Sequence, residues 1–126
     1  MPPVGVYGRA KATGEDGIMD RTVLVVLSKP VEGREAEYNS WYNDQHLHDV
    51  LAVSGFVSVE RLKRRGAPVS AHEWTYCALY EIDHPRPEEV VADMMSRIGT
   101  DTMPISDALD EDFMCALYEP IVHLQK

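Results

Sequence analysis

Four residues between positions 38 and 49 have the side chains and the spacing that proton transfer requires. Tyr38, Tyr42, His46 and Asp49 follow one another at intervals of three or four residues, and residues so spaced share one face of an α-helix. The imidazole can exchange a proton near neutral pH, a phenol can donate a hydrogen bond to a carbonyl or enolate oxygen, and the carboxylate could orient the imidazole. An ordinary packed helix with polar edges would give the same pattern.

The elements that must position these residues can be read from the hydrophobic pattern. It predicts four strands and two helices in the order β-α-β-β-α-β, which is typical of the ferredoxin-like fold, an α+β arrangement with two helices on one face of a four-stranded antiparallel sheet. The strands are expected at 21–28, 56–63, 73–82 and 113–124, and the helices at 34–51 and 87–98. Residues 1–19 are expected to form a flexible arm, and residues 20–126 a single domain.

Composition and charge exclude several classes of function. The net charge of −9 argues against a nucleic-acid-binding protein, because phosphate neutralisation requires Lys and Arg. No apolar run is long enough to span a membrane, and no signal peptide is recognisable, so a cytoplasmic location is expected.

His46 and His48 are a poor metal pair, because two residues apart on a helix they point in nearly opposite directions. The sequence has no phosphate-binding loop or dinucleotide motif, and we expect neither a metal nor a cofactor.

The expected sheet has apolar side chains on both of its faces. In the third expected strand, Trp74, Tyr76 and Tyr80 alternate with Cys77 and Leu79, so neither face resembles one that is exposed to water. Two helices cover one face only, and the other face needs a second cover. A second copy of the chain, packed sheet against sheet in a two-fold homodimer, is the simplest cover.

The segment from Glu35 to Arg61 resembles the EthD-like branch of the dimeric α/β-barrel superfamily. Its members have a helix with an acidic residue, an aromatic residue, Asn-x-Trp-Tyr and a His four residues after the Tyr, followed by Leu, by Val-x-Gly and by a strand that leads to Arg. The matching residues here are Glu37, Tyr38, Asn39, Trp41, Tyr42, His46, Leu51, Val53, Gly55, Phe56 and Arg61. The chain departs from the pattern at His48, where the family usually has Pro, which could extend the helix.

The resemblance implies ferredoxin-like protomers whose sheets join in a barrel-like dimer. The superfamily contains cofactor-free cyclases, oxygenases, isomerases, decarboxylases and dehydratases, and also haem proteins, so the resemblance fixes the fold better than the reaction. We expect a cofactor-independent enzyme of the lyase, isomerase, cyclase or decarboxylase type, acting on a small apolar, aromatic or polyketide-like molecule. A non-catalytic ligand-binding accessory protein and a cofactor-free oxygenase remain alternatives.

The candidate site residues fall into two groups. His46 would move a proton, Tyr42 would hold a substrate oxygen, and Asp49 would orient the imidazole. Candidate substrate-binding residues are Tyr38, Asn39, Trp41, Tyr76 and Tyr80. Each has a structural alternative, since aromatic residues on strands and helices are more often part of a core or an interface.

Overall fold

The computed structural model describes residues 21–67 and 74–126, and the expected arm at 1–19 lies outside these ranges. The main chain forms four strands and two helical regions, the first of which is divided in three. In chain order the elements are β1 (Arg21–Ser28), α1 (Glu35–Trp41), η2 (Tyr42–His46), α2 (Leu47–Leu51), β2 (Phe56–Lys63), β3 (Tyr76–Asp83), α3 (Pro87–Arg97) and β4 (Met114–Tyr118). The predicted β-α-β-β-α-β order is confirmed.

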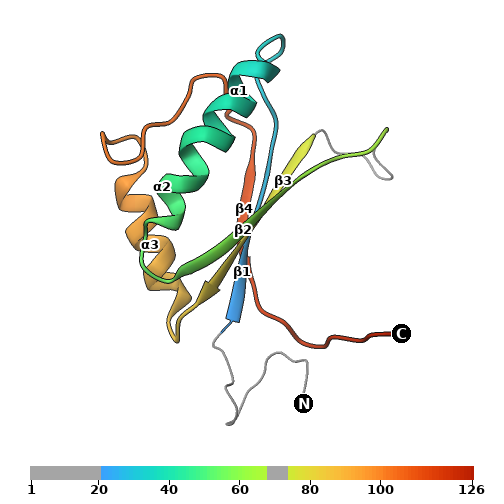
Figure 1. The fold of residues 1–126 in the computed structure, drawn as a ribbon, viewed down its shortest axis with the longest axis vertical. Coiled ribbons are helices and arrows are strands. Elements are labelled where there is room, and N and C mark those ends of the chain that lie inside the picture. The colour runs from blue at the N-terminus through green and yellow to red at the C-terminus, as the bar shows by residue number, and fades with distance from the viewer. Residues whose placement is uncertain (1–20, 68–73) are drawn as a thin grey trace.

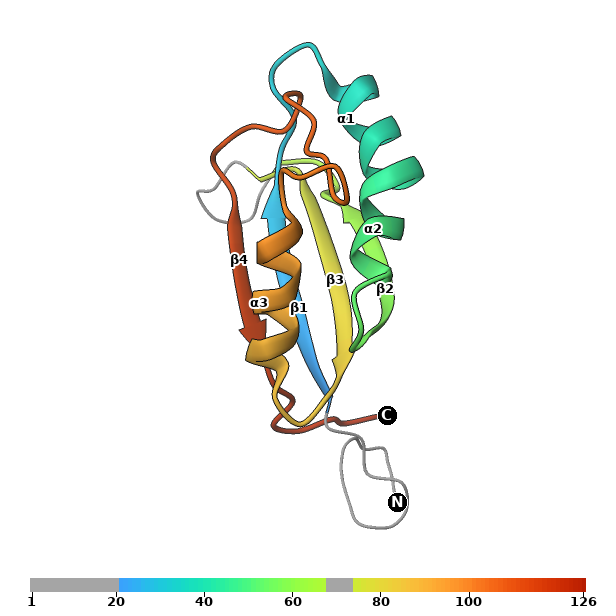
Figure 2. The ribbon, with the colours of Figure 1, turned by 90° about the vertical axis from the view of Figure 1, so that its left-hand side faces the viewer.

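The four strands form one antiparallel sheet in the order β2-β3-β1-β4. The helical segment α1–η2–α2 and helix α3 lie side by side on the same face of this sheet (Figure 1). Seen from the helices, α3 lies nearer β1 and β4, and the longer segment lies nearer β2 and β3 (Figure 2). This is the ferredoxin-like α+β fold that the sequence predicts. None of the helices in the described residues is long and apolar enough to cross a membrane.

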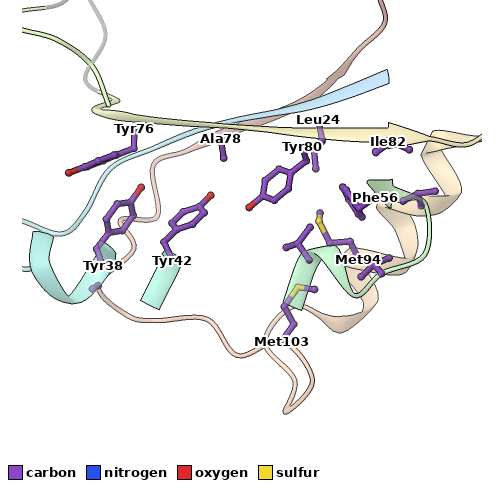
Figure 3. Packing of buried hydrophobic residues seen from close by; sticks show 14 residues of the cluster. Leu24, Tyr38, Tyr42, Phe56, Tyr76, Ala78, Tyr80, Ile82, Met94 and Met103 are labelled. Carbon is purple, nitrogen blue, oxygen red and sulfur yellow. The ribbon is translucent and has the colours of Figure 1, made fainter. Parts of the chain in front are cut away.

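The core fills the space between the helices and the sheet. Strand residues alternate between faces, and on β3 the side chains of Tyr76, Ala78, Tyr80 and Ile82 are buried against the helices. The helices contribute Tyr38, Tyr42, Val50, Val90 and Met94 to the same cluster (Figure 3). The expected grouping of Tyr76 and Tyr80 on one face of the third strand is therefore confirmed.

The first helical segment is not the uniform α-helix that the sequence predicts. Residues 42–46 form a π-helix, marked by the hydrogen bond from the Leu47 N–H to the Tyr42 carbonyl five residues earlier. The buried positions Tyr38, Tyr42, His46 and Val50 are four residues apart, and on a regular α-helix each such step would drift by about 40°. Since a π segment turns the chain less per residue, it keeps these four side chains facing the sheet. The stripe thus ends at Val50, and Asp49 lies at its half-buried edge.

The third and fourth strands have other bounds than those expected. The third strand begins at Tyr76, and Trp74, expected within it, precedes the strand and donates its indole N–H to the Asp112 carbonyl at 3.1 Å. The fourth strand ends at Tyr118, where its pairing with Val23 of β1 ends. Pro120 follows, and a proline cannot donate a ladder hydrogen bond, so the expected continuation to 124 is wrong.

A tight turn joins α2 to β2 and seats both against helix α3. Gly55 has φ = 107°, and an added Cβ atom would lie 2.5 Å from Cγ2 of Val90. Only a glycine combines this backbone conformation with so close an approach. The turn therefore fixes the start of β2 relative to the helices, and with it the position of Arg61 on that strand.

The sheet face opposite the helices is rich in apolar side chains. The strand register places Val23, Val25 and Leu27 of β1 on this face. Their cross-strand neighbours include Cys77, Leu79, Met114, Ala116 and Tyr118. No helix among residues 21–67 and 74–126 covers this face (Figure 1).

Candidate active site

His46 is buried on the sheet-facing side of the helical segment. Only 9% of its surface is exposed. Its ring stacks on the indole of Trp41, with centroids 4.6 Å apart and planes inclined by 23°, and meets the Tyr42 ring edge-on at 5.2 Å. Trp41 is itself held by a hydrogen bond from its indole N–H to the Pro104 carbonyl at 3.0 Å. The imidazole is thus fixed by aromatic packing on two sides.

The surroundings keep this imidazole neutral. Burial lowers the pKa of His46 from 6.5 to about 4, an effect that Asp49 opposes and the positive charge of Arg61 reinforces. Its Nδ1 atom is buried and has no hydrogen-bond partner within residues 21–67 and 74–126. At neutral pH, His46 is consequently an uncharged group that can accept a proton, rather than a histidine that caps the end of its own helix.

Four tyrosines bring hydroxyl groups into the space between helix and sheet. Tyr38 and Tyr42 come from the helical segment, and Tyr76 and Tyr80 from β3 (Figure 3). Ring centroids lie 5.5 Å apart for Tyr38 and Tyr42, and 5.2 Å apart for Tyr38 and Tyr76. The Tyr38 hydroxyl shares a hydrogen bond of 2.6 Å with the Ser28 hydroxyl, so it is occupied within the fold.

The hydroxyls of Tyr42 and Tyr80 lie close enough for each to affect the pKa of the other. They point toward each other across the helix–sheet space (Figure 3), and the Tyr80 hydroxyl has no hydrogen-bond partner in the described part of the chain. Burial raises the pKa of Tyr42 to about 12 and also raises the pKa of Tyr80. Both therefore stay protonated at neutral pH and can donate a hydrogen bond to an oxygen.

Asn39 reaches the site only through Tyr76. Its amide donates to the Tyr76 hydroxyl at 3.0 Å, and that hydroxyl donates to the carboxylate of Glu35. The hydrogen bond from Tyr76, together with the charge of Lys63, lowers the pKa of Glu35. These contacts fix the ring of Tyr76. The amide N–H of Asn39 is already engaged in this hydrogen bond to Tyr76.

Asp49 lies close enough to His46 for its charge to raise the pKa of the imidazole. One carboxylate oxygen, Oδ2, is buried without a hydrogen-bond partner in the described chain, and the Nδ1 atom of His46 makes no hydrogen bond either. The pair is therefore coupled through charge, and no hydrogen bond at Nδ1 joins the two. His48, two residues from His46, is exposed on the other side of the helix.

Arg61 is a site residue that the sequence analysis named only within the family pattern. It lies on β2 opposite Ala78, and its guanidinium carbon is 4.2 Å from the centroid of the Tyr42 ring and 4.9 Å from that of Tyr76. Its Nη1 atom donates to the side-chain oxygen of Asn43 in the π segment at 2.7 Å. Side chains two residues apart on a strand lie on the same face, so Arg61 lies on the same face as the core-facing Val59. This alternation was the signal that could have identified Arg61.

Unpaired polar atoms gather around His46 and Tyr42. In the described residues, six buried side-chain nitrogen or oxygen atoms have no hydrogen-bond partner, and five of them belong to His46, Asp49, Arg61 and Tyr80. The sixth is Oγ1 of Thr22. Buried polar groups in folded proteins are nearly always hydrogen-bonded, so such a concentration distinguishes this region from the rest of the core. No group of three His, Cys, Asp or Glu side chains in the described ranges could hold a metal ion.

The fold of the chain is similar to that of several solved structures. An ethyl tert-butyl ether D (EthD) family protein from Bacillus halodurans is 16% identical over 80% of this chain and 99% of its own, with a TM-score of 0.54. The chain has the fold of an EthD family protein. The resemblance expected from the segment between Glu35 and Arg61 is thereby confirmed at the level of the fold.

Two further structures share the EthD-like fold. One is a candidate monooxygenase from Shewanella loihica, 14% identical over 85% of this chain and 100% of its own, with a TM-score of 0.55. The other is a mutant of MhuD with two manganese protoporphyrin IX molecules bound per active site, 14% identical over 83% of this chain and 99% of its own, also with a TM-score of 0.55. No family model matches the sequence, and the comparison with curated proteins finds no significant match.

Proposed function

We propose that this chain is an enzyme that transfers a proton on a small, largely apolar or aromatic molecule bound between the helical segment and the sheet. The observation that carries the proposal is the cluster of buried side chains with unpaired polar atoms around His46. In an ordinary core those atoms would be paired within the fold. A ligand with one or two oxygen atoms would satisfy them.

The proposed roles follow from the protonation states of the side chains. His46, neutral at pH 7, accepts a proton from the substrate, and the nearby charge of Asp49 stabilises the imidazolium that forms. Tyr42 and Tyr80, both protonated, hold the oxygen on which negative charge develops. Tyr38, Trp41 and Tyr76 surround the apolar part of the substrate, and Asn39 keeps Tyr76 in place.

The low proton affinity of His46 restricts the substrate. A base with a pKa of about 4 removes only a rather acidic proton, and only where the resulting anion is stabilised. A carbon between two carbonyl groups, or one next to a carbonyl and an aromatic ring, meets this condition. Polyketide-like molecules and anthrones carry such positions, which favours them over simple ketones or alcohols.

The resulting anion could eliminate a leaving group, isomerise, cyclise or lose carbon dioxide. Oxygenation is the second candidate, favoured by the fold that the chain shares with a candidate monooxygenase. Incubation of the purified protein with anthrone separates these outcomes. Oxygen consumption with formation of anthraquinone would support the oxygenase, and hydrogen exchange at the acidic carbon without oxygen uptake would support the other reactions.

A ligand-binding accessory protein is the non-catalytic alternative. It would bind an aromatic molecule in the same space without turnover, and its affinity would not depend on the imidazole of His46. An acidic ketone that binds but does not exchange its hydrogen faster than in buffer would favour this reading over the enzyme.

We also propose that two copies pair through the sheet face opposite the helices. The support for this is the row of apolar residues on that face, including Leu62 and Tyr118, which are 44% and 55% exposed. An exposed apolar surface of this kind is typical of an interface. The site itself lies on the helix side of each sheet, so each protomer would carry its own set of His46, Tyr42 and Arg61.

A further inference from the structure

One edge of the Arg61 guanidinium is buried and unpaired within the described part of the chain. Its Nε and Nη2 atoms are buried and have no acceptor among residues 21–67 and 74–126, whereas Nη1 is bound to Asn43. We infer that Arg61 is the substrate-recognition residue of the proposed enzyme, and that it binds a two-oxygen anionic group on an aromatic ligand: a carboxylate or the enolate of a 1,3-dicarbonyl. This inference rests on the proposed function and adds a class of substrate to it.

The geometry of the free edge fits such a group. The N–H bonds of Nε and Nη2 run parallel on one side of the planar guanidinium, and that spacing matches the two oxygens of a carboxylate. Two other arginines among residues 21–67 and 74–126 use this edge to bind a carboxylate. Arg34 binds Glu37 through Nε at 3.1 Å and Nη2 at 2.6 Å, and Arg97 binds Asp93 through Nε at 3.0 Å and Nη2 at 3.3 Å.

Arg61 differs from these two arginines because no carboxylate in the described part of the chain pairs with it. The ion pairs within the described residues involve other cations, although the protein carries an excess of acidic side chains, 21 against 12 Lys and Arg. A buried charge without a counter-ion is costly. A ligand that supplies the counter-ion would therefore bind with a strong electrostatic contribution.

The guanidinium is held ready for that ligand. The rings of Tyr38, Tyr42 and Tyr76 lie within 5.4, 4.2 and 4.9 Å of its central carbon, contacts within the range of cation–π interactions. The bond to Asn43 fixes its rotation, and the π segment positions Asn43. A side chain restrained in this way loses little conformational entropy when the ligand binds.

An anion bound to this edge of Arg61 would also make His46 a stronger base. The positive charge of Arg61 is one of the causes that lower the pKa of His46. A bound carboxylate or enolate would neutralise that charge and raise the proton affinity of the imidazole. Substrate recognition by Arg61 and proton transfer by His46 would thus be coupled.

Calorimetric titration with two naphthalene ligands of nearly the same shape tests the inference. The expected result is that the wild-type protein binds 2-naphthoate at least about tenfold more tightly than the uncharged 2-naphthamide, and that high salt reduces this preference. Arg61→Gln should abolish the preference while the amide still binds. Arg61→Lys should keep part of it, because an ammonium retains the charge but cannot bind both oxygens side by side.

Arg86→Gln is the matched control. Arg86 is exposed at the start of α3 and pairs with Glu89, and its loss should leave the preference unchanged. Circular dichroism and thermal melting establish that each variant is folded. If Arg61→Gln does not fold, the Arg61→Lys variant and the salt dependence of the wild type still decide the question.

A third ligand separates the two kinds of anion. Benzoylacetone is a 1,3-diketone whose enolate absorbs in the ultraviolet at a longer wavelength than its neutral forms. Enolate formation on the wild type but not on Arg61→Gln would identify the enolate as the recognised group, whereas a preference for naphthoate alone would identify the carboxylate.

Equal affinity of the wild type for 2-naphthoate and 2-naphthamide, with no enolate formed from benzoylacetone, would overturn the role of Arg61. So would an unchanged preference in Arg61→Gln. In either case the proposed enzyme stands if a ketone still exchanges its hydrogen in a His46-dependent way. If Arg61 confers the preference but no such exchange is found, the anion site stands and the proton-transfer function fails.

Discussion

The imidazole of His46 lies stacked on the indole of Trp41, with ring centroids 4.6 Å apart, while Tyr42 closes a second side of it. The two stacked residues are joined by the helix that bears them, and the indole N–H is tied to the Pro104 carbonyl in the loop before β4. This packing removes the imidazole from water, and burial is the main cause of its low pKa. Burial, to which these two aromatic neighbours contribute, thus keeps His46 a neutral proton acceptor at physiological pH.

The low pKa of His46 should be visible in the pH dependence of stability. The unfolded chain takes up a proton at this residue near pH 6.5 and the folded protein only near pH 4, so the unfolded state binds more protons between these values. The free energy of unfolding should therefore fall as the pH drops from 6.5 to 4, by at most about 3 kcal/mol from this residue. Below about pH 4 this loss should be complete and constant.

Urea denaturation of wild type and His46→Gln at pH 7 and pH 4.5 measures this contribution. The variant should lose less stability between the two pH values than the wild type. His48→Gln, which replaces the exposed histidine two residues later, should retain the wild-type dependence. Equal losses in wild type and His46→Gln would mean that His46 titrates normally and is not buried.

The turn at Gly55 should be sensitive to a single added methyl group. Gly55→Ala would place a Cβ atom 2.5 Å from Val90 at a φ of 107°, so it adds both backbone strain and overpacking, together about 2–4 kcal/mol. Gly33→Ala is the matched control, since Gly33 also has a positive φ (82°) but has no atom within 4 Å of the added Cβ. It should cost only about 1–2 kcal/mol.

Chemical denaturation of both variants compares the two costs. If Gly55→Ala proved no more destabilising than Gly33→Ala, the close packing of the α2–β2 turn against α3 would be refuted. A larger loss for Gly55→Ala that is partly relieved in the double variant with Val90→Ala would locate the clash at that contact.

The proposed pairing of sheets can be tested with one charge. Val25 lies in the middle of β1 on the face away from the helices, beside Leu79 and Ala116, and Val25→Asp would bury a carboxylate in the interface. We expect the wild type to sediment as a dimer at micromolar concentration and the variant as a monomer. Met95→Asp is the control, because Met95 is 56% exposed on α3, on the helix side. A monomeric wild type would contradict the pairing.

The backbone followed from the sequence more closely than the site did. Strands 21–28 and 56–63 have the expected bounds, because their β-branched runs and the flanking Pro30 and Gly55 are strong local signals. The expected last strand is too long, since the apolar residues beyond Pro120 have no partner strand among the described residues: Ile121 is 95% exposed. Pairing, which ends at Tyr118, is a long-range property that local pattern does not contain.

The site was only partly predictable for a similar reason. The helical spacing identified Tyr38, Tyr42 and His46 as neighbours, but it assumed a uniform helix and so placed Asp49 on the stripe instead of Val50. The π segment keeps the four buried side chains facing the sheet, and the helical spacing alone does not predict it. Arg61 was overlooked as a site residue because a charged residue on a strand normally faces water, and only the tertiary fold reveals that its guanidinium lies over Tyr42.

Hydrogen–deuterium exchange at the acidic carbon of anthrone and benzoylacetone, followed by NMR or mass spectrometry without oxygen, is the decisive measurement of proton transfer by His46. The wild-type protein should accelerate exchange of at least one of them. His46→Gln should lower this rate by about 10²-fold or more, and His48→Gln should leave it unchanged. A folded His46→Gln protein that exchanges at the wild-type rate, or a wild type that accelerates neither exchange, would contradict the assignment of His46 as the proton acceptor of an enzyme.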